Sequence, residues 1–364
     1  KYATPRCTQI VPDEGEINIE DLIANEGCII TITHAGYIKR TAVSSYRAQR
    51  RGGKGVIGMV PKDGEGSEEG TPDDFVEHLF TASTHDYLLF FTNTGRLYVE
   101  KVYEIPEMGR AAKGKSLANV LEMQAGEKIA ALICVKEFSD KQHLVMATAS
   151  GIVKKTNLVD YSNFRKGGII AIKIEEGDEL IGTCLTEGGN EIVLVTYKGL
   201  SLRFHEEQLR DQGRATMGVY GIRPVKGDHV VGLAVVNSDS MLLVAGENGI
   251  GKRTGFDEYR AQSRGGKGII TMKTTDKTGN VIGVLAVKEA DEIMLITVKG
   301  QMVRIPVKGI REIGRNTQGV KLINLEGGDK LQAIAPVVTG EDEEGTSGEE
   351  TALSASESEN KSEK

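Results

Sequence analysis

The sequence predicts an all-β fold in which six propeller-like blades of four short strands each form a ring. Two glycine markers recur along the chain at the same interval, and an apolar strand follows them in most repeats. Four strands in each unit of about 50 residues are typical of radially repeated sheets, which protect their edges by closing into a ring. Only 8 prolines occur in 364 residues, so few positions would interrupt such strands.

The first marker is a hairpin: a short apolar strand, a glycine turn, and a second strand with one or two cations. It occurs at 29–40, 88–101, 145–155, 194–203, 242–253 and 294–304, with turns at Gly36, Gly95, Gly151, Gly199, Gly249 and Gly300. Successive turn glycines are 59, 56, 48, 50 and 51 residues apart. Val, Ile and Leu alternate with polar residues in these segments, which is the period of a strand.

The second marker is a glycine that opens another strand, at Gly55, Gly114, Gly168, Gly218, Gly268 and Gly319. These glycines are 59, 54, 50, 50 and 51 residues apart, so two independent markers keep one interval. A fourth apolar element follows at 127–135, 178–185, 229–236, 280–287 and 330–338. The chain contains no Trp, which disfavours a WD40 propeller. Helix is scarce, with one or two turns expected near residues 19–27.

The charge of the chain is divided unevenly between its body and its end. The net charge is −7, but residues 341–364 hold nine acidic and two basic residues, which leaves 43 of each sign in the rest. We therefore predict a ring over 5–338 and a disordered acidic tail over 339–364. The tail is either a solubilising end or a tethered polyanion that competes for a cationic surface. Residues 63–74 are expected to form an acidic solvated loop.

Signatures of catalysis and of metal binding are missing from the sequence. Cys7, Cys28, Cys134 and Cys184 are scattered without a C-x-x-C pair, which indicates reduced thiols in a cytoplasmic protein. The six histidines lack the spacing of metal ligands. No apolar run approaches the roughly 18 residues that a membrane span needs, so we expect no membrane contact. The chain begins at Lys1 without Met, as an excised piece of a longer protein would.

One stretch suits a phosphate backbone: Gln49, Arg50, Arg51, Gly52, Gly53, Lys54 and Gly55. Glycine lets backbone N–H groups approach an anion, arginine adds a planar fork, and lysine adds a point charge. Residues 27–62 carry seven Lys and Arg residues and no Asp or Glu. We therefore predict that this stretch contacts nucleic-acid phosphates.

Further cations recur in register with this stretch and are predicted to contact the same ligand. Alone, each is as well explained as a solvated surface charge, and it is the recurrence that favours binding. The hairpin strands contribute Lys39, Arg40, Lys154, Lys155, Arg203, Lys252, Arg253 and Arg304. The loops before the second glycine contribute Arg47, Arg110, Lys113, Arg165, Lys166, Arg214, Arg264, Lys267 and Arg315.

Residues 109–116 match the G-x-x-x-x-G-K-S phosphate-loop pattern. A phosphate loop needs a preceding buried strand and a following helix in a parallel sheet. Here the segment falls where the first repeat has Arg51 to Gly55, and Arg110, Lys113 and Gly114 take the places of Arg51, Lys54 and Gly55. We interpret it as a second loop for nucleic-acid phosphates, with an ATPase site as the less favoured alternative.

Gln49 to Gly55 resembles the seven-residue box of the C-terminal domain of the DNA gyrase A subunit. The resemblance extends over the six repeats and the acidic tail, and Gln262 to Gly268 is a near copy with Ser263 in place of an arginine. In that family the fold is a six-bladed β-pinwheel with DNA around its rim, and the resemblance implies the same here. The box would then be the clamp that holds the last part of the DNA bend.

The resemblance also implies what lies outside this chain. No Arg-Tyr dipeptide is present, so the family's strand-cleaving tyrosine is missing and the chain alone is expected not to be an enzyme. ATP, Mg²⁺ and hydrolysis would belong to the gyrase B subunit, in an A2B2 assembly that introduces negative supercoils in the bacterial cytoplasm, at the nucleoid. Two alternatives remain: the C-terminal DNA-bending domain of the topoisomerase IV A subunit, and a propeller scaffold for protein ligands.

Overall fold

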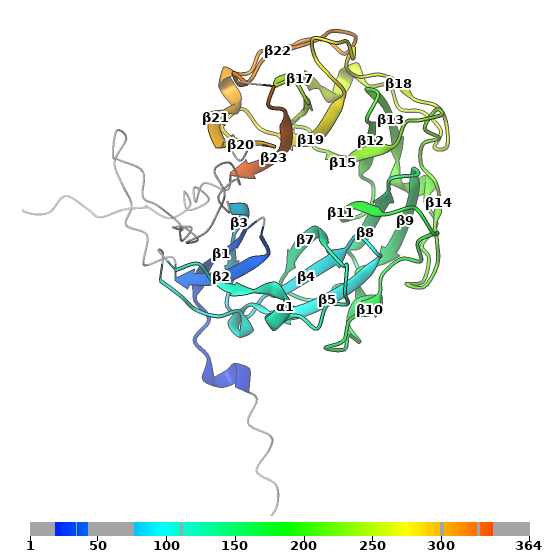
Figure 1. Cartoon of the computed structure of the whole chain (residues 1–364). Coiled ribbons are helices and arrows are strands. Elements are labelled where there is room, and N and C mark those ends of the chain that lie inside the picture. The colour runs from blue at the N-terminus through cyan, green and yellow to red at the C-terminus, as the bar shows by residue number, and fades with distance from the viewer. Residues whose placement is uncertain are drawn as a thin grey trace, which may run out of the picture.

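The computed structural model describes residues 19–33, 35–42, 76–109, 112–298, 302–325 and 328–337. Over these residues the chain forms six antiparallel sheets arranged around a common centre (Figure 1). The all-β ring of six blades predicted from the repeats is confirmed. Three predicted features lie outside the described residues: the box at 49–55, the acidic segment at 63–74 and the tail at 339–364.

Each blade is built on a hairpin at the predicted place, and we number the blades by these hairpins. The first strands, in the interior of each sheet, are β1 (Gly27–Thr33), β4 (Tyr87–Thr92), β8 (His143–Thr148), β12 (Glu191–Thr196), β16 (Met241–Gly246) and β20 (Glu292–Thr297). The second strands are β2 (Tyr37–Ala42), β5 (Arg96–Lys101), β9 (Ile152–Asn157), β13 (Leu200–His205), β17 (Ile250–Gly255) and β21 (Met302–Pro306).

A third set of strands surrounds the centre of the ring in Figure 1. They are β3 (Val76–Ser83), β7 (Ile129–Val135), β11 (Leu180–Thr186), β15 (Val230–Val236), β19 (Val281–Val287) and β23 (Leu331–Val337). Each pairs with the first strand of its own hairpin. The first and last blades meet where β23 lies beside β3. The sequence patterns predicted five of these strands and missed β3, because the long first repeat separates β3 from its hairpin.

The fourth strand of a blade is supplied by the following repeat. The short strands β6 (Lys115–Ser116), β10 (Ile169–Ile170), β14 (Val219–Tyr220), β18 (Ile269–Ile270) and β22 (Val320–Lys321) each begin directly after a glycine of the second marker. They pair with β2, β5, β9, β13 and β17 of the preceding blade. Within the described residues the sixth sheet has three strands, β21-β20-β23. The strand count was predicted, but this exchange between repeats was not.

In the part of the chain that the structure describes, helices are limited to single turns. The 3-10 turns are η1 (Ile19–Leu22), η3 (Val102–Glu104), η4 (Leu158–Tyr161), η5 (Glu206–Gln208), η6 (Phe256–Glu258) and η7 (Val307–Gly309), and the α-helical turn is α1 (Leu117–Val120). The last five 3-10 turns follow the second hairpin strand directly, where each redirects the chain toward the next loop. No helix in the described part of the chain has the length and apolar character to cross a bilayer.

The core is divided among the spaces between neighbouring blades. In β4, Leu88 and Phe90 point into a cluster with β1, whereas Leu89 and Phe91 point into a cluster with β8. Neighbouring blades cover both faces of such a strand. Accordingly, Leu88 to Phe91 form an unbroken apolar run, and all residues of β4 after Tyr87 are buried. The predicted alternation of apolar and polar residues does not hold for these interior strands, because a neighbouring blade packs on each of their two faces.

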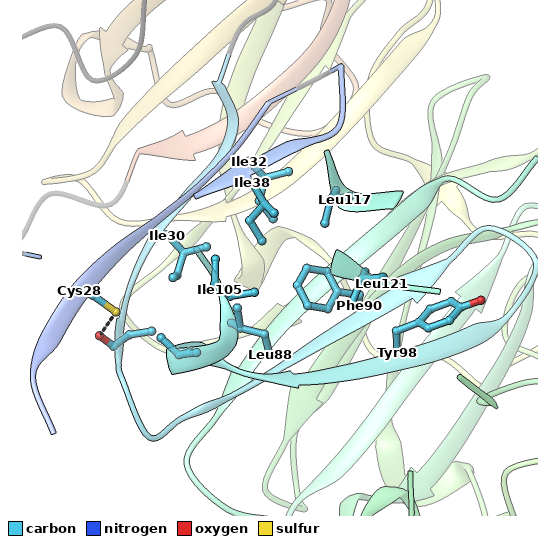
Figure 2. Close-up of a cluster of buried hydrophobic side chains, with 12 residues drawn as sticks. Cys28, Ile30, Ile32, Ile38, Leu88, Phe90, Tyr98, Ile105, Leu117 and Leu121 are labelled. Carbon is cyan, nitrogen blue, oxygen red and sulfur yellow. Dashed lines mark hydrogen bonds between the residues drawn. The ribbon is translucent and has the colours of Figure 1, made fainter. Parts of the chain in front are cut away.

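Figure 2 shows one of these clusters, between blades 1 and 2. Ile30 and Ile38 come from the first blade, Leu88 and Phe90 come from the second, and all four side chains have no exposed surface. At its edge, the thiol of Cys28 donates a hydrogen bond to the carbonyl of Ala82. Burial raises the pKa of this thiol to about 11. It therefore stays protonated at neutral pH, in agreement with a reduced core cysteine.

The glycines before the outer strands are required by close approach as well as by backbone conformation. At Gly218, φ is +101°, and a Cβ there would lie 2.5 Å from the carbonyl oxygen of Val153. Residues with a side chain rarely adopt such a φ. A contact of this length with backbone would also push β14 away from β9. The glycine therefore permits the outer strand to reach the blade.

We expect Gly218→Ala to lose more stability than Gly177→Ala. Gly177 has a comparable φ of +84°, but nothing lies within 4 Å of its Cβ position, so alanine there meets only the backbone penalty of roughly 1–2 kcal/mol. Overpacking against β9 should add about 1–3 kcal/mol at Gly218. Urea unfolding of the two variants measures the difference, and equal losses would show that the contact with β9 is unimportant.

Candidate nucleic-acid interface

The loops that correspond to the box lie at the outer edge of the ring, each directly before an outer strand. Their described residues are 109, 112–114, 163–168, 211–218, 262–268 and 311–319. Figure 1 places β10, β14, β18 and β22 at this edge, on the opposite side of their blades from the inner strands. Arg110 in the first of these loops, Arg47 and the whole of Gln49 to Gly55 lie outside the described residues. Their predicted DNA contacts stay predictions.

Backbone hydrogen bonds join consecutive loops. The amide of Lys173 donates to Thr216 at 3.0 Å, that of Arg223 to Gly266 at 2.8 Å, and that of Lys273 to Thr317 at 2.9 Å. Each bond runs from the segment after one outer strand to the box-like loop of the next repeat. The rim of blades 2 to 5 is therefore one continuous, hydrogen-bonded surface.

Three of the predicted DNA contacts are buried. Lys39, Lys154 and Lys252 have no exposed surface. The Nζ of Lys39 lies 2.9 Å from the carbonyl of Ala112, and the Nζ of Lys252 lies 2.7 Å from that of Gly314.

The third buried lysine shows the same arrangement, since Lys154 Nζ donates to the carbonyls of Ala171, at 2.7 Å, and Arg214. All three side chains hold the loop of the next repeat by satisfying its carbonyl groups. A buried ammonium cannot reach a phosphate in this conformation. We therefore correct the prediction for these lysines and assign them to loop support.

The cations next to these buried positions are paired with carboxylates. Arg40 lies 3.1 Å from Glu107, Lys155 lies 3.1 Å from Asp211, and Arg253 lies 3.7 Å from Glu289. Arg203 and Arg304 pair with Glu191 and Glu292 on the adjacent strands. Of these five side chains only Arg304, at 50 %, is more than a fifth exposed. The hairpin strands thus add little net positive charge to the rim.

The predicted loop cations fall into two groups. Arg165, Lys166 and Lys267 are exposed on the rim. Arg214, Arg264 and Arg315 are half-buried, and their Nη1 atoms donate to the carbonyls of Asn163, Tyr220 and Ile270 at 3.5, 3.3 and 3.2 Å. Lys113 is also half-buried, with its Nζ 4.2 Å from the centre of the Tyr37 ring. Among the predicted loop cations, the exposed Arg165, Lys166 and Lys267 are therefore the ones that could contact a ligand directly.

Sequence reasoning missed several exposed cations on the rim, and three of them, Lys173, Arg223 and Lys273, recur at one position. Each lies four residues after the start of its outer strand, and Arg223 is 50 residues from both Lys173 and Lys273. That interval is the signal that could have revealed them. They are held in place by the loop-to-loop hydrogen bonds described above, so their positions repeat from blade to blade.

A pocket of about 310 Å³ on the outer side of blades 1 and 2 carries carboxylates between the cations. Glu100, Glu104 and Glu122 line it together with Lys115 and Lys166. Burial, together with the hydrogen bond and negative charge of Glu104, raises the pKa of Glu100 well above its ordinary value. The raised pKa favours the neutral form of Glu100 and so lowers the negative charge of the pocket beside Lys166.

The structure gives no support to a nucleotide site at 109–116. The segment continues into β6, which pairs antiparallel with β2, and the helix that follows has only four residues. The carbonyl of Ala112 accepts a hydrogen bond from the buried Lys39, as the carbonyls of Arg214 and Gly314 do from Lys154 and Lys252 in two other box-like loops. Among the described residues no group of His, Cys, Asp and Glu side chains could hold a metal ion.

Comparison with known proteins identifies the repeats. A family described as "DNA gyrase C-terminal domain, beta-propeller" matches residues 29–82, 86–136, 142–183, 190–237, 240–288 and 291–337. The chain belongs to this family. Each matched segment contains the hairpin of one blade and all or most of its inner strand, and the expected family resemblance is therefore confirmed.

Full-length relatives of this gyrase family are considerably longer than the chain. The DNA gyrase A subunit of Clostridium acetobutylicum is 47% identical over 363 residues, which are 100% of this chain and 43% of that protein. The corresponding protein of Mycolicibacterium smegmatis is 45% identical over 337 residues, 92% of this chain and 39% of that protein. The chain thus spans about two fifths of these relatives, as a C-terminal domain would.

Two solved structures share the gyrase-family ring. The chain resembles a DNA gyrase A C-terminal domain with a TM-score of 0.68 and 27% identity, covering 86% of this chain and 100% of that one. A C-terminal domain of DNA topoisomerase IV has a TM-score of 0.71 and 27% identity, covering 86% and 94%. The chain therefore shares its ring with the C-terminal domains of both proteins.

We expect the buried lysine at position 154 to make stability depend on pH. Burial lowers its pKa from 10.5 to about 7. Between these values the unfolded chain binds the proton that the folded chain has lost, so the free energy of unfolding rises with pH, by up to about 1.4 kcal/mol per pH unit. Lys154→Met should remove the part of this rise that Lys154 causes, while the part that Lys252 causes, through its pKa of about 8, should remain.

The measurement is urea unfolding of wild type and variant at pH 7 and pH 9. Leu202 occupies the equivalent position in blade 4, so Leu202→Met is a control without a titrating group that should follow the wild-type pH dependence. If the curves of Lys154→Met and wild type ran parallel across this range, the buried amine would not be the cause.

Proposed function

We propose that this chain binds double-stranded DNA without sequence preference along its outer rim, and bends and wraps it. The observation that carries the proposal is the series Lys173, Arg223 and Lys273, exposed at the same place on three consecutive blades. Arg165, Lys166 and Lys267 lie in the neighbouring loops of the same rim. A series of cations along a curved edge suits the phosphates of a bent duplex better than it suits a flat or an enclosed ligand.

A curved series of contacts is needed because DNA is stiff. Bending 20–30 base pairs by 40–90° costs about 1–6 kcal/mol, so following most of a ring costs several times more. One cationic patch cannot offset this, whereas a contact on every blade can. The hydrogen-bonded rim of blades 2 to 5 also holds these cations in fixed positions, so little of the binding energy is lost in ordering them.

The proposed function places the chain in a larger enzyme. Together with the gyrase B subunit, and with the rest of the gyrase A subunit, it would form an A2B2 assembly in the bacterial cytoplasm. The wrapped DNA would be presented to the strand-passage gate of that assembly in one orientation. Repeated passage would then introduce negative supercoils. ATP and Mg²⁺ would act in the partner subunit, and no cofactor is proposed for this chain.

The runner-up is the DNA-bending domain of the topoisomerase IV A subunit. The topoisomerase IV structure is as similar to this chain as the gyrase structure, so the ring alone does not separate the two. The box at Gln49 to Gly55 and the identity to gyrase A subunits favour gyrase. A scaffold for protein ligands is disfavoured because it would not require exposed cations at equal intervals along the rim.

We expect DNA affinity to fall steeply with salt, and a rim variant to reduce that slope. Each phosphate contact contributes about −0.9 to the slope of log K against log salt. The triple variant Lys173→Gln, Arg223→Gln, Lys273→Gln should therefore have a slope less negative by about 2 to 3. Fluorescence anisotropy with a labelled duplex of mixed sequence at several salt concentrations gives both slopes.

The matched control replaces three exposed lysines with Gln: Lys128 and Lys136, which flank the inner strand β7, and Lys141, which lies between β7 and β8. It removes the same charge away from the rim and should keep the wild-type slope. Equal changes in both triple variants would point to net charge rather than to a binding rim. Absence of salt-dependent binding in the wild type would contradict the proposal.

The wrap itself is expected to change DNA topology. When the chain is bound to relaxed circular plasmid, treatment with a type I topoisomerase should leave a change in linking number of one sign. Arg50→Ala, Arg51→Ala and Lys54→Ala together should abolish that change while short-duplex affinity stays within a few-fold of wild type. A domain that only bends DNA slightly would produce no linking-number change even as wild type, which would favour the topoisomerase IV alternative.

A further inference from the structure

The outer strands of three consecutive blades carry an exposed apolar side chain at their second residue. Ile170 is 48% exposed, and Tyr220 and Ile270 are each 43% exposed. The first residue of the same strands faces the protein: Ile169 and Val219 pack against the clusters between blades. Because side chains alternate along a strand, the second residue is directed outward. These three side chains therefore do not contribute to the core.

Each apolar side chain lies among cations. Three residues after Ile170, Tyr220 and Ile270 come the exposed Lys173, Arg223 and Lys273. The guanidinium of Arg223 lies 4.5 Å from the centre of the Tyr220 ring.

The arginines of the next loops reach the same residues, since Arg264 and Arg315 donate to the carbonyls of Tyr220 and Ile270. Exposed apolar residues that are scattered singly need no explanation, but a recurrence in register on one edge does. Each of the three blades thus presents an apolar group and cations side by side.

The composition of this surface selects its partner. An isoleucine gains nothing from a phosphate, but the grooves of a duplex expose sugar faces and base edges that apolar side chains can cover. The flanking cations complement a polyanion and would be left unpaired against an apolar protein surface. A duplex that follows the rim would bring its phosphates to the cations and a groove to the side chains between them.

We propose that Ile170, Tyr220 and Ile270 pack against the sugar faces and base edges of the DNA groove that faces the rim. The proposal rests on the function proposed above and adds a second kind of contact to it. Phosphate contacts release counterions and weaken with salt, whereas apolar contacts do not. The rim would then hold DNA with one component that depends on salt and one that does not.

The test compares salt series for two triple variants, with the same labelled duplex. Ile170→Ser, Tyr220→Ser and Ile270→Ser together should weaken binding on the order of tenfold at every salt concentration, with the wild-type slope. Lys173→Gln, Arg223→Gln and Lys273→Gln should instead change the slope. Val298→Ser is the control, since this valine is exposed directly after β20 in the sixth sheet, which contains none of the three outer strands, and the variant should bind as wild type.

Other results would overturn the proposal. Wild-type affinity of the serine variant would show that the apolar groups do not touch DNA, and a changed slope would show that the variant acts by displacing the cations. A wild type that self-associates, with a serine variant that is monomeric and binds DNA normally, would assign the surface to a second copy of the chain. Failure of the wild type to bind DNA would instead remove the proposed function itself.

Thermal unfolding of each variant establishes that it is folded before binding is compared. The exposure of the three side chains predicts an unchanged unfolding temperature. If the triple serine variant did not fold, the single Tyr220→Ser variant would carry the same test, with a smaller loss of affinity and the wild-type slope.

Discussion

The pairing of each outer strand with the blade of the preceding repeat is the interaction on which the rest of the structure depends. Val219 and Tyr220 complete the sheet of β9 only because the loop before them spans the edge of that blade. The same pairing covers the otherwise free edge of the second hairpin strand, which would be open to pairing with other chains. It also carries the box-like loop to the outer edge of the ring, where a ligand can reach it.

The buried lysines show how the loops are supported. A loop that crosses the end of a sheet has carbonyl groups that face the protein and need donors, and an ammonium group supplies three. Burying that group disfavours its charged form, which lowers the pKa of Lys154 to about 7 and that of Lys252 to about 8. In blade 4 the buried Leu202 takes the position of these lysines. Its side chain packs close to Gly266, since a Cβ added at that glycine would lie 3.1 Å from it, so apolar packing supports the loop at 262–268.

The rim that results combines two requirements of DNA wrapping. Its cations must be exposed, and they must be held at intervals that a stiff polymer can follow. The backbone bonds of Lys173, Arg223 and Lys273 to the next loops meet the second requirement, because they fix the place of each cation relative to its neighbouring blade. The carboxylates that pair with Arg40, Lys155 and Arg253 neutralise these cations, so they add little to the positive charge of the rim.

Much of the ring could be predicted from the sequence because turns are local. A hairpin glycine such as Gly151 needs a positive φ whatever its neighbours are, so its 50-residue recurrence counts the blades directly. The residues of the candidate site were harder to predict. Lys154 and Lys155 are adjacent, both cationic and on the same strand, and nothing in their sequence context shows which of them is buried.

By itself, the sequence determined the number of blades, the places of the hairpins and of the short strands, and the family to which the chain belongs. Only the tertiary structure decided which repeat completes which blade and which cations remain in solvent. The physical reason is that adjacent side chains of a strand point to opposite faces. Lys154 on one face donates to the carbonyl of Arg214, 60 residues further along the chain, whereas Lys155 on the other face pairs with the carboxylate of Asp211 in the same loop.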